Sequence, residues 1–482
     1  MGWIGSWFSN RITDMEIIEK NGRKWKKFKG DEGQDVYVAQ FVVNEDDLLG
    51  KLVDEGSYDI LVDSDADFYL PKNGFDAGDE LGEDCVAFKF RKGTFTPEEQ
   101  IGAFDGLYEA AVESNNRGHA AGPRGEKDGN RDWVTPYQQD ILAHFEQGQP
   151  QSIDGDDPLD NIFQQHQNKK YETRGEVWLR SRVEKEFGTY EGFFSLALEK
   201  LIGMSIDDAK AYSKKLRKEF VSATSYATPI WSGIAGFYGR YPRIPYGRAT
   251  AYTDHNREQF DKCYPFARKL EAEFKRLLPE RWAKQKEFAD RLDNRFLIGE
   301  DTTFTTITVN TTSKDRNARM ACHRDAGSLN AGYSNLTVVT KDGKDWKGGY
   351  LVTPEVRAAI NIRPGDLLLI DNMRIIHGNT PISAPDSGDE DMLRMSLVFY
   401  FREDMDKLGS WEYEALRKQY VDDRRKNEEH PLWKPFWNGV SPSMWDEGEW
   451  YDYLADRGGE DMLKQYHPEA RQQVSTLDDF FA

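Results

Sequence analysis

A series of short β-rich runs between residues 303 and 401 constrains the fold of this chain more than any other feature. Each run holds five to eight residues rich in Val, Ile, Leu and Thr, and Gly, Pro and Asp stand between the runs. The runs are Thr303–Val309, Leu336–Thr340, Gly349–Thr353, Asp366–Ile370 and Arg394–Phe401. Short strands with regular turn signals are typical of a β-sandwich or jelly roll. Because helical patterns flank them, we expect an α+β protein with a jelly-roll core.

Two histidines and an aspartate lie at the ends of these runs. His323 and Asp325 stand two residues apart, so on a strand or at its exit both side chains point to the same side. His377 follows a later run. A single His-x-Asp is common, but potential metal ligands at both ends of a β core are hard to explain by packing. Two imidazoles and one carboxylate form the facial triad of non-haem iron oxygenases, so we predict that His323, Asp325 and His377 bind Fe(II).

The coordination positions that such a triad leaves open predict the other reactants. A 2-oxo acid can occupy two of these positions and dioxygen the third. Arg394, at the start of the last run, suits the far carboxylate of 2-oxoglutarate, because a guanidinium grips a carboxylate through two parallel hydrogen bonds. The predicted cofactors and cosubstrates are therefore Fe(II), 2-oxoglutarate and dioxygen.

The charge and cysteine content bear on partners and compartment. The formal net charge of the 482-residue chain is −20, and nucleic-acid binding usually relies on basic surface. Basic residues do cluster at Arg23–Lys29 and Lys214–Lys218, where the simplest interpretation is a solvated face. The three cysteines show no paired spacing, which favours a reducing, cytoplasmic location. No apolar run reaches the length of a membrane span, so no membrane partner is expected.

Composition and pattern divide the chain into four regions. We expect a β-rich N-terminal region over 1–100, polar loops and helices over 101–220, the dioxygenase domain over 221–405, and an acidic helical region over 406–482. Predicted helices begin at Pro97, after the capping residue Thr96, and also cover 190–200, 206–220, 260–292 and 411–422. Pro229–Tyr252 mixes Gly, Pro, aromatic residues and arginines, and we interpret it as an ordered loop system near a site.

Several motifs in the predicted core resemble those of the TET/JBP family. They are Thr305-x-Ile307-x-Val309-Asn310, His323-Arg324-Asp325-Ala326-Gly327, Ser334–Val338, Gly348–Val352, Arg363-Pro364-Gly365-Asp366 and His377-Gly378-Asn379-Thr380. The likeness is greatest to the base J-binding protein thymine hydroxylases and their phage and viral relatives. The resemblance implies a double-stranded β-helix core that oxidises the 5-methyl group of a pyrimidine in DNA. It also implies iron ligation by His323, Asp325 and His377, and 2-oxoglutarate binding by Arg394 with help from Ser396.

A methyl group inside a duplex cannot reach a buried iron, so the target base must be flipped out or already single-stranded. Tyr238 is a candidate to stack on that base, and Arg240, Arg243 and Arg248 are candidates to contact phosphates. Two alternatives stay open: a hydroxylase of a protein side chain or small molecule, and a non-catalytic reader of modified DNA. The choice between thymine and 5-methylcytosine, and any oxidation beyond the alcohol, also stay open.

The last residues of the chain suggest a second partner. Leu477, Phe480 and Phe481 recur at a spacing that one helical turn would place on one face. This pattern resembles the short C-terminal peptides that dock into replication sliding clamps, including those of tailed phages. Docking would bring an acidic protein to DNA in the host cytosol, if a phage encodes it. The alternative is that the tail folds back onto the protein's own surface.

Overall fold

The computed structural model describes residues 15–70, 81–112, 230–240, 244–312, 320–340, 346–383, 393–427, 429–430 and 445–468. The chain divides into two compact units. The first unit joins the N-terminal strands to residues 249–406, and the second contains residues 239–248 and the C-terminal helices. No helix within the described ranges is both long enough and apolar enough to cross a membrane. The expected helices over 190–200 and 206–220 lie outside the described residues.

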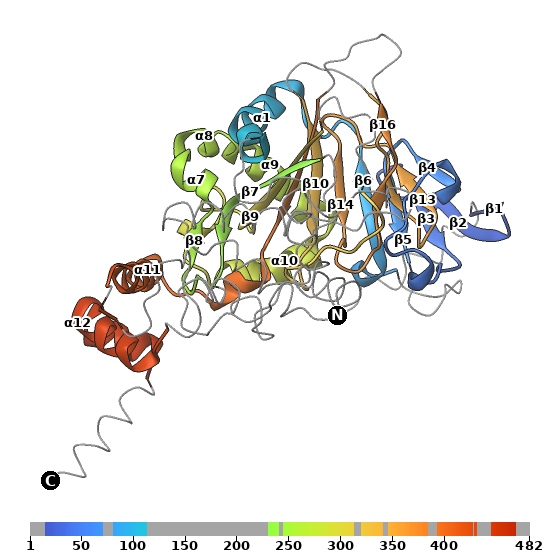
Figure 1. The fold of residues 1–482 in the computed structure, drawn as a ribbon. Coiled ribbons are helices and arrows are strands. Elements are labelled where there is room, and N and C mark those ends of the chain that lie inside the picture. The colour runs from blue at the N-terminus through green and yellow to red at the C-terminus, as the bar shows by residue number, and fades with distance from the viewer. Residues whose placement is uncertain are drawn as a thin grey trace, which may run out of the picture. The chain divides into compact units, whose positions relative to one another are not determined.

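One large mixed sheet forms the first unit's framework (Figure 1). Its strands follow this order: β1 (Glu16–Lys20), β2 (Arg23–Lys29), β3 (Asp35–Ala39), β5 (Ala66–Tyr69), β6 (Val86–Arg91), β14 (Leu367–Ile370), β10 (Ser334–Val339), β17 (Arg394–Tyr400), β9 (Thr306–Thr312), β7 (Trp231–Tyr238) and β8 (Arg248–Ala249). Four of the five strands expected within 303–401 belong to this sheet, as β9, β10, β14 and β17, and their hydrogen-bonded neighbours in the sheet are distant in sequence.

Two smaller sheets complete the β structure. One has the order β15 (Gly378–Asn379), β12 (Leu351–Thr353), β13 (Ala358–Ile360) and β4 (Ile60–Val62), and the other pairs β11 (Lys347–Gly348) with β16 (Ile382–Ser383). Leu351 and Ile360 of the four-stranded sheet share one buried cluster with Phe88, Val338 and Leu368 of the large sheet. Two sheets packed over a common core give the predicted jelly roll.

The N-terminal strands belong to the same β structure as the predicted oxygenase strands. β6 pairs antiparallel with β14, with Phe88 opposite Ile370, and β4 pairs parallel with β13, with Ile60 opposite Ala358. The expected boundary at residue 100 therefore does not coincide with a break in the sheet.

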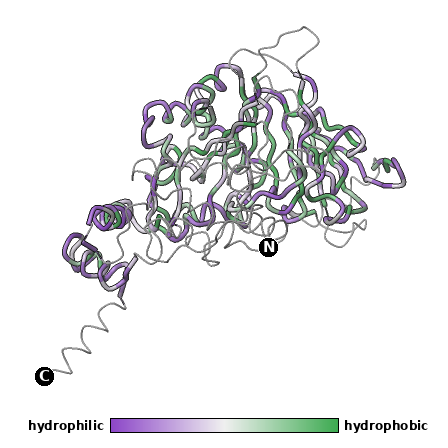
Figure 2. The backbone as a smooth tube through the Cα atoms, in the orientation of Figure 1, coloured by the Kyte–Doolittle hydropathy of each residue, from purple (hydrophilic) through white to green (hydrophobic). Residues whose placement is uncertain are grey.

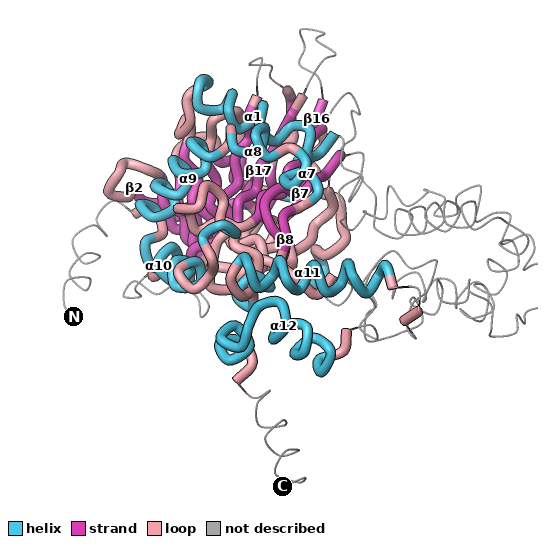
Figure 3. The backbone as a smooth tube through the Cα atoms, turned by 90° about the vertical axis from the view of Figure 1, so that its left-hand side faces the viewer, coloured by secondary structure: helices cyan, strands magenta, loops and turns pink. Residues whose placement is uncertain are grey.

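Helices cover the other face of the large sheet (Figure 3). They are α1 (Pro97–Val112), α7 (Ala251–His255), α8 (Arg257–Asp261), α9 (Tyr264–Leu277) and α10 (Pro279–Ala289). Leu107 and Leu270 from these helices share a second cluster with Leu367 and Leu369 of β14. Because β14 is covered on both faces, it reads as a continuous apolar run, and hydrophobic residues concentrate along such strands (Figure 2).

Two features of these helices follow from local sequence. Thr96 is the expected capping residue, and it forms a capping box with Glu99, since each side chain accepts a hydrogen bond from the other's backbone N–H. The single helix expected over 260–292 is instead three helices, and α10 begins at Pro279. A proline fits the first turn of a helix but would remove a hydrogen bond from its interior.

The loop system expected over 229–252 is wrong for its first half, which forms β7. Gly233 and Gly236 do not break this strand, because they allow close packing around it. A Cβ atom at Gly233 would lie 1.6 Å from the carbonyl oxygen of Ala110 in α1, and Gly236 adopts φ +93° beside Thr305. These glycines therefore allow other backbone segments to approach the strand closely, and they do not mark a turn.

The second unit contains α11 (Trp411–Lys426), which confirms the helix expected there, and α12 (Glu447–Tyr466). Aromatic side chains fill the space between the two helices, and Tyr413 and Trp450 are the most buried of them. The Arg417 guanidinium lies 4.1 Å from the ring centre of Trp445, so the core of this unit holds a cation stacked on aromatic faces.

Candidate metal centre

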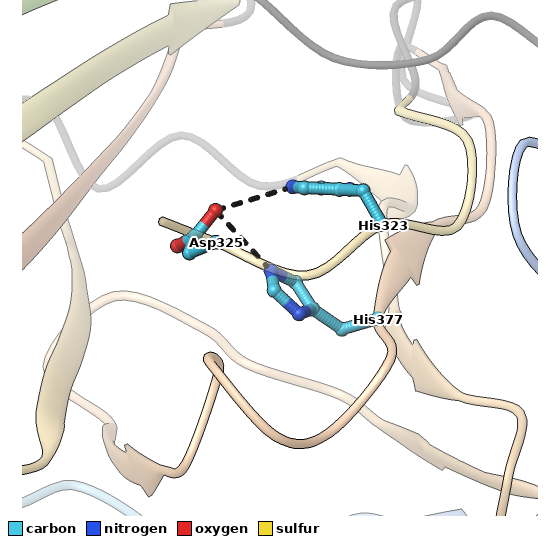
Figure 4. Close-up of side chains that lie close together, drawn as sticks. All are labelled: His323, Asp325 and His377. Atoms are coloured by element: carbon cyan, nitrogen blue, oxygen red, sulfur yellow. Dashed lines mark ion pairs between the residues drawn. The ribbon is translucent and has the colours of Figure 1, made fainter. Parts of the chain in front are cut away.

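Two backbone segments bring the predicted ligands together. His323 and His377 lie opposite each other in an isolated antiparallel bridge, and each donates its backbone N–H to the other's carbonyl oxygen at 2.9 Å. Asp325 follows two residues later and donates its backbone N–H to the Asn372 carbonyl oxygen, also at 2.9 Å. The predicted convergence of all three side chains is present in the structure (Figure 4).

The three side chains offer donor atoms at the spacing that one ion requires. Oδ1 of Asp325 lies 3.4 Å from Nε2 of His323 and 4.0 Å from Nε2 of His377. One donor atom from each residue falls within 4.8 Å of the other two. Donors about 2.1 Å from a common ion and at right angles to one another would be about 3 Å apart. The donor atoms lie farther apart than this, so the side chains would move closer together around an ion.

The backbone fixes which imidazole nitrogen faces the metal position. Nδ1 of His323 lies 2.8 Å from the carbonyl oxygen of Ala321, and Nδ1 of His377 lies 3.1 Å from that of Ile375. A carbonyl oxygen only accepts hydrogen bonds, so each Nδ1 carries the proton and each Nε2 presents its lone pair. Burial, followed by the neighbouring His323, lowers the pKa of His377 to about 4, which keeps this imidazole neutral.

A buried hydrogen-bond chain orients the carboxylate. Asn372 donates from Nδ2 to Oδ2 of Asp325, and its Oδ1 accepts a hydrogen bond of 2.6 Å from Ser334 Oγ. Asn372 is 5% exposed and Ser334 1% exposed. Sequence reasoning missed both residues. Asn372 stands five residues before His377, between the run Asp366–Ile370 and that ligand, and this position is the one signal that the sequence offers.

Arg394 is a buried cation for which the described residues form no ion pair. It is 9% exposed at the start of β17, and its Nε has no hydrogen-bond partner in the described part of the chain. Burial, followed by the charge of Arg363, lowers its pKa to about 10. An uncompensated buried charge is costly, so this position suits an anionic ligand. Ser396 lies two residues along the same strand face and is 5% exposed.

Arg363 is a second basic residue that sequence reasoning did not assign to the site. Its guanidinium lies 5.2 Å from the ring centre of Trp346 and 5.8 Å from that of Tyr350. Pro364, the next residue, bridges Val338 of β10, and Arg394 begins the strand on the other side of β10. The segments that carry the two arginines therefore flank the same strand.

The residues predicted to contact substrate have different surroundings. Tyr238 is half-buried, and the Arg402 guanidinium lies 4.8 Å from its ring centre. In the second unit, Arg240 forms hydrogen bonds through Nε and Nη2 with the buried carboxylate of Glu414. Arg248 is half-buried in β8. Arg243 and the tail residues Leu477, Phe480 and Phe481 lie outside the described residues.

The donor set fits the cofactors that the sequence predicted. Two neutral imidazoles and one carboxylate match the ligand preference of Fe(II), and the buried guanidinium matches a dicarboxylic acid such as 2-oxoglutarate. The residues that would hold iron are His323, Asp325 and His377, and the residue that would hold the far carboxylate is Arg394.

Comparison with known proteins confirms the predicted family. Residues 239–403 match the Tet_JBP family, described as the oxygenase domain of the 2OGFeDO superfamily. The chain is 28% identical over 211 residues to the thymine dioxygenase JBP1 of Leishmania braziliensis and 30% identical over 184 residues to that of Crithidia fasciculata. These matches cover 43% and 37% of this chain, but only 24% and 21% of the two relatives. Residues 239–403 thus match the oxygenase domain of the family that the sequence motifs resemble, and the chain spans about a quarter of the length of these two relatives.

Two solved structures that match part of this chain share little sequence with it. A structure described as NgTET1 in complex with 5mC DNA is 14% identical, with a TM-score of 0.28, and the match covers 37% of this chain and 64% of that one. A Pseudomonas putida prolyl-4-hydroxylase is 14% identical, with a TM-score of 0.20, and the match covers 42% of this chain and 88% of that one.

Proposed function

We propose that this chain, with its TET/JBP oxygenase domain, is an Fe(II)- and 2-oxoglutarate-dependent dioxygenase that hydroxylates the 5-methyl group of a pyrimidine base in DNA. The observation that carries the proposal is the convergence of His323, Asp325 and His377, with both Nδ1 atoms anchored to backbone carbonyl oxygens. The relatives in Leishmania and Crithidia carry the name thymine dioxygenase, which supports thymine as the target base. 5-Methylcytosine is the other candidate.

When bound, iron with 2-oxoglutarate and dioxygen supplies the oxidising chemistry that converts a methyl C–H bond into an alcohol, with succinate and carbon dioxide as co-products. The protein supplies position. The imidazoles of His323 and His377 present Nε2, and Asp325 presents Oδ1 because Asn372 binds its other oxygen. Arg394 orients the cosubstrate through its far carboxylate, and Ser396 assists from the same strand face.

The substrate base would enter beside Asp325. The Asp325 side chain is 38% exposed, whereas those of His323 and His377 are 12% and 10% exposed, so the carboxylate lies on the open side of the site. Ser328, three residues after Asp325, bridges the backbone of Arg402, whose side chain stacks over Tyr238. We assign this stacked pair to contact with the unstacked base, since aromatic and guanidinium planes recur in single-strand binders.

The structure does not support all three of the arginines that were expected to contact DNA phosphates equally. Arg240 is already paired with a buried carboxylate, which favours a structural role for it. Arg243 and Arg248 remain proposed phosphate contacts. The chain's net charge of −20 is the observation that favours the alternative, a hydroxylase of a protein side chain or small molecule.

One experiment separates these functions. The protein is incubated with Fe(II), 2-oxoglutarate and oligonucleotides that contain thymine, 5-methylcytosine or neither 5-methyl base, and both succinate and modified nucleosides are measured by mass spectrometry. We expect succinate to rise only with a 5-methylpyrimidine and to match the hydroxymethyl base in amount. His323→Ala is the control. Succinate formation that ignores DNA would favour the alternative hydroxylase, and binding of modified DNA without turnover would favour a reader.

The clamp-binding tail stays a prediction. Deletion of residues 475–482 is expected to leave activity on short oligonucleotides unchanged and to lower modification of replicating DNA in cells, because tethering raises local concentration without adding contacts at the active site. Loss of oligonucleotide activity, or no change in either measurement, would contradict it.

A further inference from the structure

Arg324 stands between the ligands His323 and Asp325, but its side chain serves another purpose. In an extended segment alternate side chains point to opposite sides, so Arg324 faces away from the metal position. Its Nε donates a hydrogen bond of 2.7 Å to the carbonyl oxygen of Arg374. Its Nη2 donates one of 2.9 Å to Oε1 of Glu355. The guanidinium thus reaches the segment that leads into the third ligand, His377.

Glu355 completes a second link between the two ligand segments. Its side chain is 7% exposed, and its other oxygen, Oε2, accepts a hydrogen bond of 2.6 Å from the backbone N–H of Ile376. One carboxylate therefore holds the residue between the first two ligands and also the residue directly before the third. This link lies on the opposite side of the backbone from the metal position, so it is separate from the bridge between His323 and His377.

The N-terminal region braces the same segments. Cys322 exchanges two backbone hydrogen bonds with residues 50 and 51, at 2.9 and 2.8 Å. The Val43 N–H donates to the Glu355 carbonyl oxygen at 3.0 Å, and Glu45, in the short 3-10 helix Glu45–Asp47, forms an ion pair with Arg324. Residues 43–51 therefore contact the segment of Arg324 and the segment of Glu355, which are the two sides of this link.

We propose that Arg324 and Glu355 are positioning residues that fix His323 and Asp325 relative to His377, with residues 43–51 as their brace. The inference rests on the proposed function in one respect, which is that the three ligands bind a metal. Metal sites need their ligands held to about half an ångström, and groups behind the ligands supply that precision. The Arg324–Glu355 pair is suited to this because a charge-assisted bond to a planar guanidinium restricts direction as well as distance.

The test measures metal binding without DNA or 2-oxoglutarate. Co(II) replaces iron as the probe, since its visible absorption reports coordination geometry as well as occupancy. We expect Arg324→Met and Glu355→Gln each to weaken Co(II) binding about 10- to 100-fold and to change the absorption spectrum. Glu45→Gln should have a smaller effect, about two- to fivefold, because its partly exposed ion pair is weaker.

The matched control is Arg91→Met. Arg91 and Asp67 form a buried ion pair of 2.7 Å in the same unit, and among the described residues their other side-chain hydrogen bonds and ion pairs are with residues 32, 34, 66, 89 and 90. Arg91→Met should lower the melting temperature of the metal-free protein but leave the Co(II) affinity and spectrum unchanged. If Arg324→Met and Glu355→Gln behave like this control, their role is only structural and the proposal is overturned.

Two further variants keep the outcome clear. Arg324→Lys retains the charge but cannot reach both Glu355 and the Arg374 carbonyl oxygen, so it should recover the metal-free melting temperature and only part of the affinity. If Arg324→Met does not fold, wild-type affinity and spectrum in Arg324→Lys would overturn the proposal. A wild-type protein whose Co(II) spectrum matches that of His377→Ala would instead show that His377 is not a ligand and that the triad does not form, which refutes the proposed function itself.

Discussion

Asn372 and Asp325 are tied together twice, through side chains and through backbone. The Asn372 amide donates to Oδ2 of Asp325, and the Asn372 carbonyl oxygen accepts the Asp325 N–H. With Oδ2 occupied, Oδ1 is the oxygen that faces Nε2 of both histidines. A carboxylate on a short loop could otherwise rotate away or bind an ion through both oxygens. The asparagine therefore selects one ligand atom from Asp325.

Replacement of Asn372 should weaken metal binding without unfolding the protein. We expect Asn372→Ala to raise the dissociation constant for Fe(II) or Co(II) about 10- to 100-fold, as is usual when a residue behind a metal ligand is lost. Ser334→Ala, one hydrogen bond further away, should have a smaller effect. Asn361→Ala is the control, because Asn361 donates to Asp63 away from the ligands. Calorimetric titration gives the affinities, and a wild-type value for Asn372→Ala would contradict this role.

The ligands themselves could be predicted from sequence, whereas the residues behind them could not. His323 and Asp325 form a recognisable pair at the end of a β-rich run, and the chemistry of an iron triad requires these residue types. Asn372, Glu355 and Arg324 are ordinary polar residues whose significance depends on contacts between distant parts of the chain. No local pattern records that Glu355 would reach Ile376.

The fold likewise has features that the sequence could predict and features that depend on contacts between distant parts of the chain. Alternation and turn residues predicted the strands of the core, because those signals are local. The parallel pairing of β4 with β13 joins residues about 300 positions apart, and β7 was mistaken for a loop because its glycines serve close packing against α1. A glycine in sequence does not distinguish a turn from a tight contact.

Loss of any iron ligand should abolish turnover. His323→Ala, Asp325→Ala and His377→Ala each remove one of three donors while the two hydrophobic clusters on either face of the sheet stay intact. We expect succinate formation to fall to background and the melting temperature of the metal-free protein to change by only a few degrees. Near-normal turnover in Asp325→Ala would refute the triad.

Arg394 should control the affinity for 2-oxoglutarate. Removal of one partner of a buried charge pair costs about 2–5 kcal/mol, so Arg394→Ala should raise the 2-oxoglutarate dissociation constant by about 30-fold or more. Arg394→Lys should recover part of the affinity, because a point charge replaces a planar fork. Anaerobic calorimetry with the Co(II) protein measures both variants. An unchanged affinity in Arg394→Ala would move the role to another arginine, with Arg363 as the first candidate.

The pKa of Arg394 adds two expectations. A value of about 10 leaves the guanidinium charged at pH 8, so the affinity for 2-oxoglutarate should be nearly constant from about pH 7 to 9. Burial lowers this pKa, which means that the folded protein disfavours the charge when no anion is bound. Arg394→Met should therefore raise the melting temperature of the cosubstrate-free protein even though it weakens 2-oxoglutarate binding.

The cysteines should differ in reactivity because they differ in burial. Cys263 and Cys322 are 0% and 1% exposed, and burial raises the pKa of the Cys322 thiol to about 12, whereas Cys85 is half-buried. At pH 8 we expect brief alkylation of the native protein to add one adduct, at Cys85, and alkylation in denaturant to add three. Peptide mapping locates the adducts. Rapid reaction of Cys322 would show that the segment next to His323 opens in solution.

Arg240 offers a direct test between a structural role and a phosphate contact. Its guanidinium and the backbone N–H groups of Gly247 and Gly409 all donate to the carboxylate of Glu414, which is 1% exposed. Arg240→Met leaves that carboxylate buried without its cation, so it should destabilise the second unit by about 3–5 kcal/mol. Glu414→Gln keeps an oxygen acceptor for the backbone groups, and in the double variant Arg240→Met/Glu414→Gln no charge is buried. The double variant should therefore be more stable than Arg240→Met alone, as measured by urea unfolding.

If Arg240 contacts phosphate instead, the double variant would lose DNA affinity, and the slope of log affinity against log salt concentration would fall by about one. A structural role predicts the wild-type slope, so the two roles give opposite results in the same protein.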